Sequence, residues 1–134
     1  MYENILLLMD CSPVDETILN HVVELAKIHK SKVHLFHVVH AHTLDQQRIL
    51  VAKTEECLLT AQAMLEKEHI PASHSFSEGE PSELVLAKVT GSDFDLVALA
   101  THGHKGISDI VLGSVSRILK HHSDKPILML QGEK

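Results

Sequence analysis

Aromatic residues are scarce in this sequence: they make up 3% of its 134 residues, with no tryptophan, one tyrosine and three phenylalanines. Base-stacking platforms for single-stranded nucleic acid need such rings, so this class of binder is disfavoured. Positive charge is also in deficit, because 12 Lys and Arg against 18 Asp and Glu give a formal net charge of −6. That balance disfavours a nucleic-acid binder that works through a broad basic surface.

Cysteine is equally scarce, since Cys11 and Cys57 are the only two and neither belongs to a CxxC pair. Two such cysteines do not indicate a disulfide framework. The first residues, MYEN, lack the basic start of a secretory signal. No apolar run approaches the roughly 20 residues that span a bilayer. We therefore expect a cytoplasmic protein in which both thiols are reduced.

The pattern of apolar residues predicts an α/β fold. Residues 5–9 and 96–100 are uninterrupted apolar runs, which favour strands covered on both faces. Strands and helices are expected to alternate along the chain, which is typical of a parallel sheet with helices on both faces. Residues 1–134 should form a single domain. The predicted strands are 5–9, 33–39, 71–76, 96–100 and 127–130, and the later helices are 44–68, 81–89 and 114–122.

Local signals refine these elements. Ser12 followed by Pro13 predicts an N-cap and the first position of a helix, and Glu80 followed by Pro81 marks a second start. Gly91 is expected to close that second helix as its C-cap. The polar character of strand 71–76 favours an edge position in the sheet. The buried seam of helix 44–68 is predicted to be Val51, Thr54, Leu58, Ala61 and Leu65.

A binding site is expected beyond the carboxyl ends of the two apolar strands, where open α/β sheets bind ligands. The second of these strands leads into a loop that carries Gly103 and Gly106, and Gly113–Ser114 then opens a helix. Free backbone N–H groups at a helix N-terminus form an anion site. The alternative is that the glycines only make turns and that Ser114 is only an N-cap. Neither a P-loop nor a G-x-G-x-x-G signature is present.

The residues at this point carry a family resemblance. Ala100-Thr-His-Gly103, followed after nine residues by Gly113–Ser114, resembles the G-x-x-G-x9-G-[ST] motif of the universal stress proteins. The start Ile-Leu-Leu-Leu-Met-Asp10-Cys-Ser12 agrees, and the resemblance covers essentially the whole chain. It implies a Rossmann-like sheet of five parallel strands in the order 3-2-1-4-5. It also implies a homodimer formed through the last strand, Ile127–Leu130.

The function implied by the resemblance is that of a cytoplasmic stress-response protein, a regulatory dimer that binds ATP or AMP, with Mg²⁺ beside the triphosphate. Asp10 would meet the adenine, Val38 would contact the base through its backbone, and Gly113–Ser114 would hold phosphates. Ala100 replaces the first motif glycine, and its methyl group would weaken binding if it pointed at the ribose or phosphate. The expected nucleotide site is Met9, Asp10, Cys11, Ser12, Val38, Ala100, Thr101, His102, Gly103, His104, Gly113, Ser114, Val115 and Ser116.

Three alternatives remain at this level. The chain could be a slow ATPase, although only His102, His104 and Asp10 offer a general base, and we predict no catalytic residue. It could be a dimeric interaction module without nucleotide. The 12 histidines raise the hypothesis of a zinc or nickel site near His40, His42, His102 and His104. We favour the interpretation that these are polar loop residues, and we predict no metal site.

Overall fold

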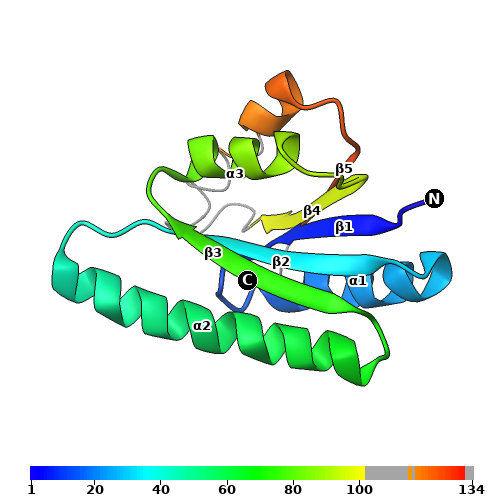
Figure 1. Cartoon of the computed structure of the whole chain (residues 1–134), viewed down its shortest axis with the longest axis horizontal. Coiled ribbons are helices and arrows are strands. Elements are labelled where there is room, and N and C mark those ends of the chain that lie inside the picture. The colour runs from blue at the N-terminus through cyan, green and yellow to red at the C-terminus, as the bar shows by residue number, and fades with distance from the viewer. Residues whose placement is uncertain (102–114, 116, 132–134) are drawn as a thin grey trace.

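The computed structural model describes residues 1–101, 115 and 117–131, which build one parallel sheet of five strands in the order β3-β2-β1-β4-β5 (Figure 1). The predicted fold class and strand order are confirmed. Residues 115 and 117–122 are also helical. The elements are β1 (Asn4–Leu8), α1 (Asp15–His29), β2 (Lys32–Val39), α2 (Leu44–Lys67), β3 (Ala72–Glu78), α3 (Pro81–Thr90), β4 (Leu96–Thr101) and β5 (Ile127–Gln131).

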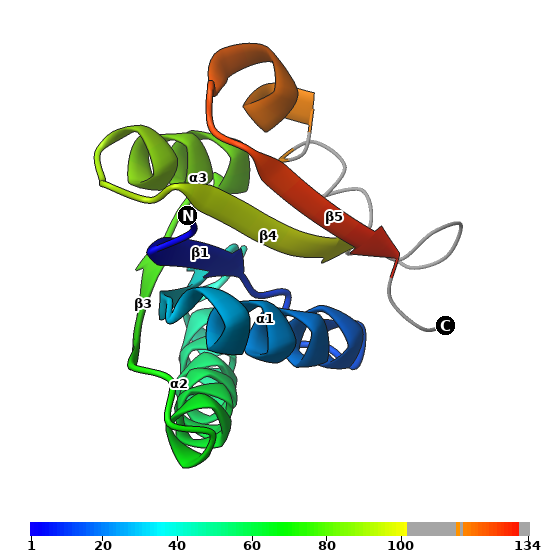
Figure 2. The ribbon, with the colours of Figure 1, turned by 90° about the vertical axis from the view of Figure 1, so that its right-hand side faces the viewer.

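Helices cover both faces of the sheet. Helices α1 and α2 pack on one face, while α3 and helical residues 117–122 pack on the other (Figures 1 and 2). Side chains of a strand alternate between the faces. Ile5 and Leu7 therefore enter the core below α1, and Leu6 and Leu8 enter the core below α3. This double burial explains why β1 is apolar without alternation.

Polar contacts align the strands at their N-terminal ends. The carboxylate of Asp95 accepts hydrogen bonds from the backbone N–H groups of Glu3, at 2.9 Å, and Asn4, at 3.1 Å. It thereby holds the start of β1 beside the start of β4. At the opposite side β3 is an edge strand, as predicted, and its hydroxyls at Ser73 and Ser75 contact the ring nitrogens of His34.

Most local signals act as the sequence predicts. Glu80 caps α3, because its carboxylate accepts the N–H of Glu83 at 2.8 Å, and Gly91 is the C-cap. Along α2 the seam is buried at Thr54, Leu58, Ala61 and Leu65, whereas Val51 is only half-buried. Among the described residues, no helix is both long enough and apolar enough to cross a membrane.

The predicted start of the first helix was wrong. Helix α1 begins at Asp15, and Val14 occupies the N-cap position without a side-chain hydrogen bond. Ser12 lies in the preceding turn, where its hydroxyl donates to the carboxylate of Asp10 at 2.5 Å. A hydrogen bond to an ionised carboxylate is roughly twice as strong as one between neutral groups. Ser12 therefore orders the loop that leaves β1 instead of capping the helix.

Candidate functional site

The site predicted from the sequence lies at the carboxyl edge of the sheet. Strands β1 and β4 are neighbours there, with Leu8 paired to Leu99, and the loop after β1 leaves from the same edge. The structure describes eight of the expected site residues: Met9, Asp10, Cys11, Ser12, Val38, Ala100, Thr101 and Val115. The others lie outside the described residues: His102, Gly103, His104, Gly113, Ser114 and Ser116.

Four of the expected residues surround one small cavity of about 40 Å³. Strands β1 and β2, helix α3 and the helical residue Val115 contribute its walls, so it opens on the α3 side of the sheet. Apolar side chains dominate the lining, and Asp10 and His37 are its ionisable groups. The lining consists of Leu8, Met9, Asp10, Phe36, His37, Val38, Pro81, Val85 and Val115.

His37 is a cavity residue that the sequence reasoning did not place in the site. Its Nδ1 lies 2.7 Å from the backbone carbonyl of Met9, and since a carbonyl can only accept, Nδ1 carries the proton and donates. Burial lowers the pKa of His37, so the ring is neutral near pH 7. The sequence offered one indication that His37 lies near the site, namely its position next to Val38.

The loop after β1 is held by a buried carboxylate that sequence reasoning also missed. Asp15 is 6% exposed and accepts the backbone N–H of Asp10, at 3.0 and 3.1 Å to its two oxygens, and that of Cys11 at 2.6 Å. Cys11 has a positive φ of 58°, which turns its N–H toward this carboxylate. The sequence indicated Asp15 only as an acidic residue that favours the start of a helix.

Ala100, in place of the first motif glycine, does not face this cavity. Its side chain is 1% exposed and packs in the core on the α1 side of the sheet, whereas the cavity lies on the α3 side. The methyl group is therefore accommodated within the apolar core. Thr101, the next residue, ends β4 and pairs with Gln131 of β5.

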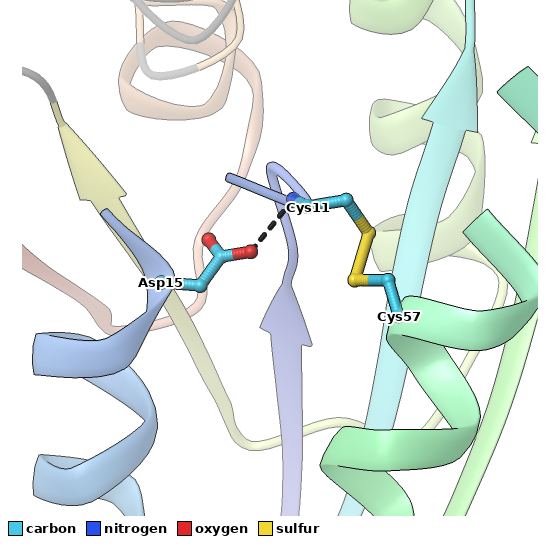
Figure 3. Close-up of side chains that lie close together, drawn as sticks. All are labelled: Cys11, Asp15 and Cys57. Atoms are coloured by element: carbon cyan, nitrogen blue, oxygen red, sulfur yellow. Dashed lines mark hydrogen bonds between the residues drawn. A yellow bond between two sulfur atoms is a disulfide. The ribbon is translucent and has the colours of Figure 1, made fainter. Parts of the chain in front are cut away.

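Cys11 and Cys57 form a disulfide, so the prediction of two reduced thiols was wrong for this structure (Figure 3). Their Cα atoms are 5.9 Å apart, within the range that a disulfide spans. The bond joins the loop after β1 to helix α2. It borders a second cavity of about 470 Å³ between the start of α1 and α2. Met9 lines both cavities and thus separates them.

The histidines of the described segments do not converge on a metal site. His40 and His42 stack edge to face, with ring centroids 5.2 Å apart. Within those segments, the group whose ligand atoms lie close enough for a metal is instead Cys11, Asp15 and Cys57. His102 and His104 lie outside the described residues.

The pH dependence of stability is expected to carry the signature of Asp15. Burial raises the pKa of Asp15 from 3.8 to about 6. Between these values the folded chain binds more protons than the unfolded chain, so the contribution of Asp15 to stability falls as pH rises. The loss amounts to about 3 kcal/mol by pH 7. Urea unfolding from pH 4 to 7 should show this fall for the native chain and not for Asp15→Asn, and parallel curves would contradict it.

A doubly wound α/β domain with its candidate site at the carboxyl edge describes a broad class of nucleotide- and ligand-binding proteins. The chain belongs to the universal stress protein family, whose family model matches residues 1–131. Universal stress protein Sll1388 of Synechocystis is 25% identical over 126 residues, which cover 94% of this chain and 78% of that protein.

Solved structures share the fold over nearly the full length. The hypothetical protein MJ0577 superposes with a TM-score of 0.85 at 23% identity, covering 100% of this chain and 99% of that one. A universal stress protein family member from Arabidopsis thaliana, solved with AMP bound, gives a TM-score of 0.75 at 14% identity, covering 98% and 92%. At these identities the likeness shows the common architecture.

Proposed function

We propose that this protein binds an adenine nucleotide, ATP or AMP, beyond the carboxyl ends of β1 and β4, with the adenine at the small cavity beside β1 and β2. The observation that carries the proposal is the small cavity that brings together Met9, Asp10, Val38 and Val115, four residues of the expected nucleotide site. The AMP-bound Arabidopsis relative supports the choice of ligand class.

The cavity, at about 40 Å³, is smaller than an adenine ring and would form only the floor of its site. Apolar side chains of β1, β2 and α3 offer contact to one face of the ring there, as apolar linings do in most small-molecule sites. Asp10 supplies an acceptor at the rim for a ring amino group. The phosphates, with Mg²⁺ beside a triphosphate, are assigned to Gly103 and Gly113–Ser114, which lie outside the described residues. Ala100 does not oppose binding at the cavity, because its methyl group is buried in the core.

Nucleotide binding is expected to raise the melting temperature. At a ligand concentration 100 times Kd, binding stabilises the folded chain by about 2.7 kcal/mol. For a chain of this size that corresponds to a rise of about 10 °C. Differential scanning calorimetry with AMP, ATP and ATP–Mg²⁺ measures it.

The matched variants are Asp10→Ala in the cavity and Glu16→Ala on the exposed first turn of α1. Asp10→Ala should weaken binding by about tenfold, since one hydrogen bond to a charged group is lost, and Glu16→Ala should not change it. A native chain that melts at the same temperature with and without millimolar nucleotide would disprove the proposal. It would favour the interaction module without nucleotide.

We also propose that the protein acts in the cytoplasm as a regulatory homodimer in the stress response, paired through β5. This strand is an edge of the sheet, and Met129 on it is 42% exposed. An open edge of backbone N–H and C=O groups is a template for pairing with a second copy.

Sedimentation equilibrium tests the dimer. Met129→Asp should shift a dimer toward monomer, because it places a carboxylate on each copy of the paired edge strand, and the two charges repel and lose hydration there. Ile49→Asp places the same charge on the exposed side of α2, where Ile49 is 57% exposed, and should leave the mass unchanged. A native chain that sediments as a monomer at micromolar concentration would rule the pairing out.

A further inference from the structure

The disulfide is open to attack from the cavity beside it. Cys11 and Cys57 are both partly exposed, and both line the cavity of about 470 Å³ between the start of α1 and α2. Its walls are mainly apolar, from Met9, Leu19 and Met64, and Lys53 and Glu56 are its charged residues from α2. A small thiol can therefore approach either sulfur without unfolding of the sheet.

A buried acid stands next to the same bond. The sulfurs of Cys11 and Cys57 and a carboxylate oxygen of Asp15 all lie within 4.8 Å of one another (Figure 3). Because Asp15 is almost fully buried, its protonated form is favoured relative to an exposed carboxylate. A proton reservoir beside a disulfide serves the group that must leave as a thiolate.

We propose that Cys11–Cys57 is a redox-active disulfide that exchanges with a low-molecular-weight thiol entering this cavity, with Asp15 as the proton donor. A bond that only staples the fold would need neither the open cavity nor the adjacent acid. In a reducing compartment, protein disulfides are usually transient or redox-sensing.

The reaction proceeds in two exchanges. The thiolate of the small molecule attacks the Cys57 sulfur, a mixed disulfide forms there, and the bond to Cys11 breaks. The Cys11 sulfur leaves with the electron pair and takes a proton from Asp15, which solvent then reprotonates. A second small thiolate attacks the mixed disulfide and releases Cys57. In sum, the protein disulfide and two thiols give a protein dithiol and one small-molecule disulfide.

Cys11 is the sulfur that we expect to leave. Its backbone N–H donates to the Asp15 carboxylate at 2.6 Å, so Cys11 and the acid are held together in the same loop. The raised pKa of Asp15, about 6, keeps a usable fraction of the acid protonated near neutral pH. Cys57 comes from α2 instead. Attack on Cys57 therefore leaves the departing Cys11 sulfur beside its proton donor.

The test uses the native chain in buffers of reduced and oxidised glutathione. After acid quench and alkylation, intact mass spectrometry measures the fraction of dithiol at each ratio. We expect reversible interconversion, approached from both directions, at ratios found in cytosol. A disulfide that stays intact in all such buffers, or that opens only in denaturant, would overturn the proposal and make the bond structural.

Two variants test the roles of the residues. Cys11→Ser leaves Cys57 alone, and it should accumulate a glutathione adduct that the native chain resolves. Asp15→Asn should slow reduction by about tenfold at pH 7 and remove the change in rate near pH 6. Among the described residues, Asp10 is the ionisable group that acts on Asp15, and Lys53 and Glu56 from α2 line the same cavity. Glu56→Gln, the control, should keep the native profile, and an unchanged profile in Asp15→Asn would refute its role as proton donor.

Discussion

Replacement of Leu7 by alanine is expected to lower the free energy of unfolding by about 4 kcal/mol. Leu7 is 0% exposed at the middle of β1, the central strand, and packs against the core below α1. The truncation removes buried apolar atoms and leaves a cavity that the strand pairs on both sides prevent from collapsing. Urea unfolding of the oxidised protein measures the loss as a lower midpoint with the slope unchanged.

Leu59→Ala is the matched control. Leu59 lies on α2 and is 58% exposed, so its truncation should change the free energy of unfolding by less than about 0.5 kcal/mol. If both variants lost the same small amount, the placement of Leu7 in the core would be wrong. Because β1 ends at the candidate site, Leu7→Ala should also loosen nucleotide binding, whereas Leu59→Ala should not.

Reduction of the Cys11–Cys57 disulfide is expected to be the second large effect. The two residues are 46 positions apart in the sequence, and opening a loop of that length restores conformational freedom to the unfolded chain. The loop-entropy relation gives a loss of about 4 kcal/mol. For a domain of this size the melting temperature should fall by roughly 10–15 °C. Calorimetry with and without a phosphine reductant measures the shift.

The double variant Cys11→Ser/Cys57→Ser separates the effect of losing the disulfide from any other effect of the reductant. It should melt close to the reduced native chain, and the reductant should not change its melting temperature. If the oxidised chain and the double variant melted together, the bond would contribute nothing to stability. The redox exchange of the same cysteines is linked to this quantity, because the free energy by which the bond stabilises the fold also shifts the exchange equilibrium of the folded chain toward the disulfide.

The central strands of the sheet were predictable because an uninterrupted apolar run indicates a strand that is buried on both faces. Residues 5–9 and 96–100 carry no polar alternation, and only a strand covered on both faces tolerates that. They became β1 and β4, neighbours at the middle of the sheet. Their ends then indicated where to expect the candidate site, since the carboxyl ends of parallel strands meet at one edge.

The loop after β1 was not predictable in the same way. Pairing of Cys11 with Cys57 depends on where α2 packs, and sequence spacing carries no record of that distance. Asp15 reads as an ordinary acid of a first helical turn. Its burial follows from the left-handed turn at Cys11, which aims backbone N–H groups at the carboxylate. Both features arise from tertiary packing that no local pattern encodes.

The central place of β1 also sets the order in which the fold can close during synthesis. β1 pairs with β2 across a short stretch of chain, Ile5 with Val33, but its other neighbour is β4, where Ile5 pairs with Leu96. The edge of β1 that pairs with β4 therefore has no partner strand until about a hundred residues have left the ribosome. Long-range pairings of this kind slow folding, and until they form they leave unpaired strand edges that are prone to aggregation. β1 is synthesised early, but its pairing with β4 forms late. During that interval the nascent chain depends on protection from aggregation.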